Sequence, residues 1–134
     1  MPRIDIYFIL LAALCLICGM CLGIFMGMIH SFEFAPIHAH LNLLGWASLA
    51  IFGLVYKSFP ELAASRLAVV HFVLSSVSSV MFPAGLYFAI AYENPLFAIL
   101  ASLVALVGVL VFFANLVRLL GSSTNSAVVG RAAV

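Results

Sequence analysis

The chain has 134 residues, of which 67% are hydrophobic and 7% are charged, and its formal net charge is +1. Such a composition provides too little polar surface to cover a water-soluble globule, so it predicts an integral membrane protein surrounded by a lipid bilayer. The nearly neutral charge offers no basic patch, which excludes nucleic acid as a partner.

The first apolar run extends from Ile6 to about Ile29, which is long enough for the ~20 residues that a spanning helix needs. It is longer than the apolar region of a cleaved signal peptide, ~7–15 residues, and no small-x-small cleavage site follows it. Gly19, Gly23 and Gly27 recur at every fourth position of this run. This spacing indicates a flat groove that another helix can approach closely.

Three cysteines, Cys15, Cys18 and Cys21, also lie in the first run, three residues apart. An odd number of thiols within one helix does not indicate a disulfide framework. Thiols in an apolar helix usually behave as small packing residues, and we interpret these three in that way rather than as metal or redox groups.

Three further apolar runs follow, separated by prolines and polar residues. A turn with Glu33 and Pro36 precedes the second run, and Pro60 follows its end. The third run carries four serines between positions 75 and 79, and Pro83 near its end predicts a kink supported by neighbouring helices. Together with the first run, these segments predict helices over about 6–29, 37–56, 65–92 and 96–120.

No soluble domain remains outside these helices. The tail 121–134 is small and polar, and we expect it to be flexible. The predicted fold class is therefore an all-α membrane protein with four transmembrane helices, forming a single domain over 1–134.

The positions of the basic residues predict the topology. With four crossings, the N-terminus, the second loop and the C-terminus share one side of the membrane. These three segments contain every lysine and arginine of the chain, namely Arg3, Lys57, Arg66, Arg118 and Arg131. Because positive charge marks the cytoplasmic side, we expect both termini to be cytoplasmic.

Depth in the membrane separates the histidines. His40 precedes Lys57 by seventeen residues, or about 25 Å, whereas His71 follows Arg66 by five residues, or about 8 Å, at ~1.5 Å per residue. These two histidines therefore cannot hold one metal within a protomer. We interpret His71 as an interfacial or hydrogen-bonded packing residue. His30, at the outer end of the first helix, is either a third metal ligand or a solvated loop residue.

His38 and His40 are the strongest candidates for a cofactor site, because ionisable or metal-binding side chains inside a membrane indicate function. Two residues along an α-helix correspond to a rotation of about 200°, so the two rings leave the helix on nearly opposite sides. They cannot clamp one ion together, and each needs a second ligand from elsewhere. A ring of identical chains, with His38 of one protomer facing His40 of the next, supplies that ligand.

Haem held by two neutral imidazoles suits this arrangement, with the porphyrin in an apolar slot between helices. Two other interpretations remain open. Copper or zinc bound by His30, His38 and His40 is the leading alternative, although the opposed directions of the last two make a compact site awkward. Alternatively, His38 and His40 are only hydrogen-bonded residues at the start of a helix.

The segment PIHAHLNLLGWASLAIFGLVYKSFP resembles the tenth transmembrane helix of the catalytic subunit of haem–copper oxidases, especially the C-type oxidases and their nitric oxide reductase relatives. In that family the first histidine of the pair ligates the high-spin haem and the second ligates the low-spin haem. The resemblance covers about 25 of the 134 residues. The matching positions are His38, His40, Gly45, Trp46, Gly53, Tyr56 and Pro60.

The resemblance also implies an assembly. The family's catalytic subunit has twelve helices in three similar arcs of four, with the metal-bearing helix second in each arc. This chain resembles one such arc, so three copies would rebuild the ring, and we expect a homotrimer. One arc lacks the separate histidine set that binds copper, and neither a cross-linked histidine–tyrosine pair nor a proton channel is recognisable in the sequence, so oxygen reduction coupled to pumping is not expected.

From these observations we expect a b-type cytochrome of the bacterial inner membrane, working in electron transfer or redox sensing with a redox partner or quinol. Its haem b would be ligated by His38 and His40 of neighbouring protomers and surrounded by Asn42, Gly45 and Trp46. Iron with two histidine ligands has no open position for a gas. The alternative functions are an enzyme whose haem, copper or zinc site acts on nitric oxide or oxygen, and a cofactor-free membrane scaffold or small transporter.

Overall fold

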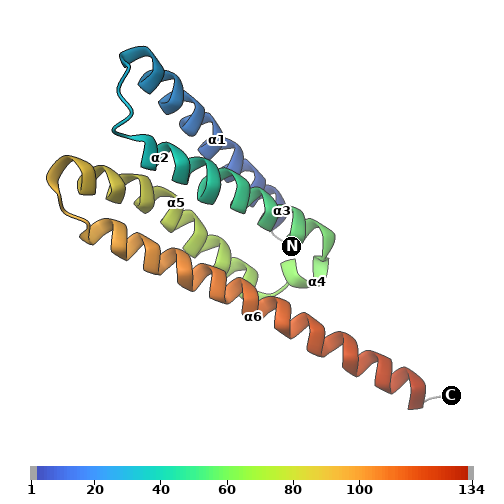
Figure 1. The fold of residues 1–134 in the computed structure, drawn as a ribbon. Helices are drawn as coiled ribbons and strands as arrows, with labels where there is room; N and C mark the ends of the chain where they lie inside the picture. The colour runs from blue at the N-terminus through green and yellow to red at the C-terminus, as the bar shows by residue number, and fades with distance from the viewer. Residues whose placement is uncertain (1–2, 133–134) are drawn as a thin grey trace.

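The computed structural model describes the backbone of residues 3–132 and the side chains of residues 3–121. Four helical segments of this part of the chain are long and apolar enough to cross a membrane, which confirms the predicted four spans. They run up and down side by side, as Figure 1 shows. The spans are α1 (Ile4–Ile29), Ala35–Ser58, α5 (Arg66–Tyr92) and the segment Leu96–Gly121 of α6 (Leu96–Ala132).

The second span is not a uniform α-helix. It begins as α2 (Ala35–His40), with a proline in its first turn as predicted, and ends as α3 (Leu49–Ser58). Between them lies η1 (Leu41–Ser48), a π-helical segment whose wider turns close hydrogen bonds from residue i to residue i+5. The wide turns therefore start directly after His40, where the sequence alone predicted an ordinary helix.

Local capping determines where the other helices begin. The backbone N–H of Leu67 donates to the Ser65 hydroxyl at 3.0 Å, and that of Leu96 donates to the Asn94 side-chain oxygen at 3.1 Å. A short helix, α4 (Pro60–Ala63), connects the second span to α5. Helix α5 continues as one helix through Pro83.

Helix α6 extends beyond the expected end of the fourth span. It continues past Leu120 to Ala132, so most of the tail that we expected to be flexible has helical backbone in the structure. No proline interrupts this stretch, and proline is the residue that most strongly stops a helix. The last two residues of the expected tail, 133–134, lie outside the described residues.

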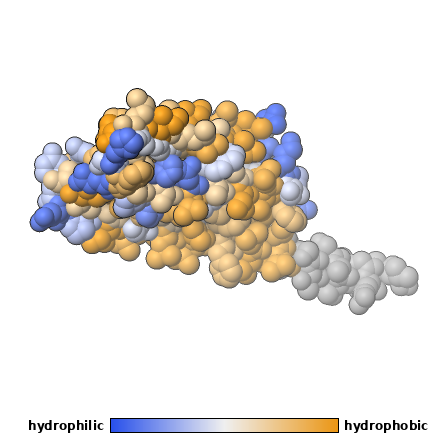
Figure 2. Space-filling view, turned by 45° about the horizontal axis from the view of Figure 1, so that its top comes forward, coloured by the Kyte–Doolittle hydropathy of each residue, from blue (hydrophilic) through white to orange (hydrophobic). Residues whose placement is uncertain are grey.

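The two ends of the bundle differ in what they carry. The N-terminus, α4 and the C-terminal part of α6 lie at one end, and the α1–α2 and α5–α6 connections lie at the other (Figure 1). We call these the Lys57 end and the His40 end, after residues near each. Helix α1 packs mainly on the second span, and α5 packs mainly on α6. Apolar side chains cover much of the face shown in Figure 2, as a lipid-facing surface requires.

The best-packed core lies toward the Lys57 end. Phe8 of α1 stacks on Tyr56 of α3, with ring centroids 5.5 Å apart, and contacts His71 of α5 at 5.0 Å. Asn115 of α6 donates from its amide to the carbonyl oxygen of Leu62 at 3.2 Å, which ties α4 to the bundle. All five residues are buried.

Candidate functional site

His38 faces α1. Its Nδ1 lies 2.8 Å from the carbonyl oxygen of Gly19, and because a carbonyl only accepts hydrogen bonds, Nδ1 is the donor. A Cβ atom on Gly23 would come within 2.8 Å of the His38 ring, whereas one on Gly27 would meet nothing within 4 Å. The predicted groove is therefore confirmed at Gly19 and Gly23, and it holds side chains of the second span.

His40 faces α5. Its Nδ1 lies 2.7 Å from the carbonyl oxygen of Pro36, one turn earlier, so this ring also donates from Nδ1 to the backbone. The imidazole stacks on Phe82 with ring centroids 4.7 Å apart and an angle of 18° between the planes. The opposite directions of His38 and His40, predicted from helix geometry, are confirmed.

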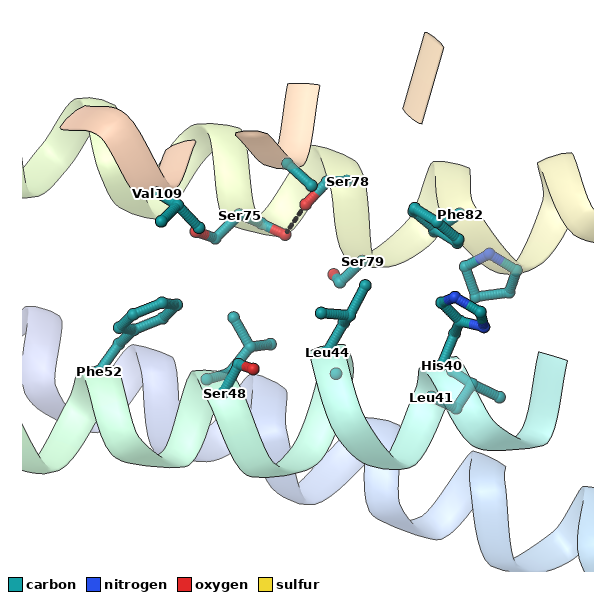
Figure 3. Close-up of a pocket in the computed structure, with 14 residues that line it drawn as sticks. His40, Leu41, Leu44, Ser48, Phe52, Ser75, Ser78, Ser79, Phe82 and Val109 are labelled. Atoms are coloured by element: carbon teal, nitrogen blue, oxygen red, sulfur yellow. Dashed lines mark hydrogen bonds between the residues drawn. The ribbon is translucent and has the colours of Figure 1, made fainter. Parts of the chain in front are cut away.

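A cavity of about 70 Å³ lies between the second span and the α5–α6 pair, and His40 forms one end of it (Figure 3). Phe52 and Val109 form part of its other end. Because a water molecule takes ~30 Å³ in the liquid, this space suits a few waters and is too small for a porphyrin. The hydroxyl groups in its wall belong to Ser48, Ser75, Ser78 and Ser79.

Asn42 lies with His38 on the α1 side. Its amide donates to the His38 carbonyl oxygen at 2.8 Å and lies 3.5 Å from His38 Nε2. A Cβ atom on Gly19 would come within 2.7 Å of the Asn42 side chain. The close contact between α1 and the second span therefore fixes Asn42 beside His38.

Gly45 and Trp46 follow Asn42 in the π-helical segment. A Cβ atom on Gly45 would come within 2.7 Å of Cys15, so this glycine permits a close approach to α1, and it also lines the cavity. Trp46 is partly buried against the apolar core. Cys15 packs as predicted, whereas Cys18 and Cys21 are exposed on the chain.

His30 is more exposed than His38 and His40. It is exposed and ends α1 in the left-handed conformation, with φ of 51°. Within residues 3–121, no three histidine, cysteine or acidic side chains lie close enough to hold a metal ion. A copper or zinc site made from His30, His38 and His40 is thus not assembled within one chain.

His71 is fully buried in an aromatic box, and the prediction of a hydrogen-bonded packing residue is confirmed. The Tyr56 hydroxyl lies 3.0 Å from its Nδ1. The rings of Phe8, Phe52 and Phe112 surround it, with centroids between 4.6 and 5.1 Å away. Its second nitrogen, Nε2, is buried and has no hydrogen-bond partner among the described residues.

Several parts of the site escaped the sequence-based interpretation. The serine cluster was visible, but its position in the wall of a cavity depends on how α5 packs against the second span. The stacking of Phe82 on His40 joins residues that are far apart in the sequence, and no local pattern indicates it. The π-helical segment likewise has no recognised sequence signal.

No family model matches the sequence, and no curated protein or solved structure matches it either. The likeness of the second span to the haem–copper oxidase helix therefore stays a prediction.

Proposed function

We propose that the protein is a membrane-bound b-type cytochrome in which His38 and His40 of neighbouring copies ligate haem iron. Its role would be one-electron transfer or redox sensing. The observation that carries this proposal is that both imidazoles donate from Nδ1 to a backbone carbonyl, at 2.8 and 2.7 Å. In a neutral imidazole the lone pair then resides on Nε2, the nitrogen that can bind a metal.

This hydrogen-bond pattern is typical of metal ligands. Metal-bound histidines almost always donate their second N–H to a carbonyl, a carboxylate or water, which fixes the tautomer and makes the other nitrogen more basic. The Gly19 and Pro36 carbonyls are suited to that role. The weak contact of 3.5 Å between the Asn42 amide and His38 Nε2 is the contact that iron would replace.

The directions of the two rings favour a haem shared between copies. His38 is directed toward α1 and His40 toward α5, so the two Nε2 atoms of one chain do not converge. A second histidine ligand would come from another copy, and a head-to-tail contact of this kind closes as a ring. A ring of three follows from the resemblance to a single four-helix arc.

The same proposal includes the location of the protein. Arg3 precedes α1, Lys57 and Arg66 flank α4, and the last part of α6 follows Arg118. These segments lie at one end of the bundle (Figure 1). We infer that this end is cytoplasmic in a bacterial inner membrane and that both termini lie there. His38 and His40 would then lie near the outer face, within reach of quinol or a redox partner.

When bound, the haem would supply reversible one-electron chemistry. The chain would hold its iron by His38 and His40 and keep these rings oriented through the Gly19 and Pro36 carbonyls. Phe82 fixes the plane of the His40 ring by stacking. Two histidine ligands leave no open position on the iron, which favours electron transfer over reaction with a gas.

The absorption spectrum of the purified protein tests this proposal. The protein is produced in cells supplied with a haem precursor, purified in detergent, and measured after air oxidation and after reduction. We expect sharp α and β bands in the reduced form that carbon monoxide leaves unchanged. A colourless protein would contradict the proposal, and bands shifted by carbon monoxide would favour the enzyme acting on nitric oxide or oxygen.

A further inference from the structure

Two cavities enter the described part of the bundle, one toward each end. The first is the serine-lined cavity that begins at His40 (Figure 3). The second, of about 290 Å³, opens at the Lys57 end, and its lining includes Arg3, Asp5, Tyr56 and Lys57. Polar and charged groups thus approach the aromatic core from both ends of the molecule.

The Tyr56–His71 pair separates the two cavities. Tyr56 lines the second cavity, and its hydroxyl lies 3.0 Å from Nδ1 of His71. On the other side of the imidazole, Cδ2 lies 3.9 Å from the Cβ position of Gly108, and the Ser75 hydroxyl lies 3.7 Å from that same position. Cδ2 is bonded to Nε2, and Ser75, one turn after His71 on α5, lines the first cavity.

Packing alone does not explain why the Nε2 atom of His71 is buried without a partner among the described residues. It is buried without a hydrogen-bond partner among residues 3–121, and its side chain is 0% exposed. Buried polar atoms are almost always paired, and proton relays are among the functions that ionisable side chains inside a membrane mark. A water at the Ser75 end of the first cavity would pair with Nε2 and connect it to the serine hydroxyls.

We propose that Tyr56 and His71 form a proton relay between the two cavities, through which the protein conducts protons across the membrane. No proton channel is recognisable in the sequence, because the residues come from separate segments and meet only in the folded bundle. The relay goes beyond the proposed cytochrome and contains neither His38 nor His40.

The transfer conserves protons and moves no electrons. A proton from water in the serine-lined cavity adds to His71 Nε2. The Nδ1–H bond then breaks as its proton passes to the Tyr56 oxygen, and Tyr56 releases its own hydroxyl proton to water in the second cavity, where Asp5 can accept it. Reorientation of the imidazole restores the starting tautomer. The aromatic walls of Phe8, Phe52 and Phe112 exclude hydrated ions, so only a proton can pass this point.

Proton flux into vesicles tests the relay. The full chain is reconstituted into vesicles of phosphatidylcholine and phosphatidylglycerol that contain a pH-sensitive dye, and a potassium diffusion potential set by valinomycin drives protons inward. We expect the dye to report a clearly faster fall of the internal pH than in vesicles without protein. Equal rates in the two preparations would overturn the proposal, whatever the variants do.

Tyr56→Phe and His71→Gln remove the two transferring groups and leave side chains of similar size. Each should lower the flux at least about 100-fold, the lower end of what a positioned proton-transfer group contributes. Tyr87→Phe and His30→Gln are the matched controls, because these residues are exposed and line neither cavity. Wild-type flux in both core variants would also overturn the proposal.

Elution profile and circular dichroism show whether each core variant folds. If one does not, a third variant still tests the path. Ser75→Val fills the end of the first cavity and should block the flux, whereas Ser102→Val, at an exposed position on α6, should not. Equal flux in both would contradict the path. Protein without haem should conduct equally, so failure of the cytochrome proposal and failure of the relay are distinguishable.

Discussion

Nδ1 of His38 donates a hydrogen bond across 2.8 Å to the carbonyl oxygen of Gly19, on the neighbouring transmembrane helix. The glycine stripe of α1 therefore does more than let two helices pack. By omitting side chains at Gly19 and Gly23 it makes room for Asn42 and His38, and it exposes the carbonyl that fixes the His38 tautomer. The position of a candidate ligand is set by residues of another helix.

A methyl group at Gly23 should disturb this arrangement. The Cβ atom of Gly23→Ala would lie 2.8 Å from the His38 ring, so the imidazole or the helix must shift. We expect a loss of about 1–3 kcal/mol in stability, the usual cost of overpacking, and weaker haem retention. Gly27→Ala is the control, because its Cβ meets nothing within 4 Å. Thermal unfolding in detergent measures both, and equal melting temperatures would show that the contact is unimportant.

Removing either proposed ligand should abolish haem binding. We expect His38→Ala and His40→Ala each to lack the α and β bands, because one imidazole on the iron does not replace two. His30→Ala should keep the bands, since His30 is exposed at the end of α1. Reduced spectra of equal amounts of folded protein give the result. Persistence of the bands in either of the first two variants would remove that residue from the ligand set.

Tyr56→Phe should also reduce stability. The change removes the 3.0 Å contact between the Tyr56 hydroxyl and Nδ1 of His71, inside a fully buried aromatic box. Hydrogen bonds inside membrane proteins contribute about 1 kcal/mol, and we expect a loss of that size. Tyr87→Phe, at an exposed position, should unfold like the wild type. Reversible unfolding in mixed micelles measures the difference, and an unchanged free energy for Tyr56→Phe would contradict this prediction.

A close approach of α5 to α6 depends on Gly85. A Cβ atom there would lie 2.6 Å from the backbone nitrogen of Ala98, and backbone cannot move aside as a side chain can. We expect Gly85→Ala to lower stability by about 1–3 kcal/mol. Gly108→Ala, on the same helix pair, meets only atoms at 3.4 Å or more and should be tolerated. If the two variants unfold at the same temperature, the helices do not approach as described.

Much of the fold is predictable from the sequence for simple reasons. Spans need long apolar runs, and such runs are readable residue by residue, so four helices could be placed with bounds close to those in the structure. The divergence of His38 and His40 follows from helix rotation alone. The end of α6 was not predictable, because Gly121 and the polar residues after it suggest a helix end, although no proline is there to enforce one.

The parts of the site that depend on tertiary packing could not be predicted. Depth along the helices correctly separated His71 from His40, but it could not show that Tyr56 approaches His71 or that Phe82 covers His40. These contacts depend on how the helices rotate about their axes. Rotation is set by the close contacts at Gly45 and Gly53, whose partners lie on another helix.

The proposal that haem is shared between copies is tested most directly by complementation. Differently tagged His38→Ala and His40→Ala chains are produced together, and mixed oligomers are isolated through both tags in sequence. One chain then supplies His40 and the other supplies His38, so a mixed ring of three restores about one of its three contacts. We predict that the mixed oligomers regain the α and β bands that each variant lacks alone. Mixed oligomers without bands, beside a wild type that binds haem, would contradict a haem held between neighbouring copies.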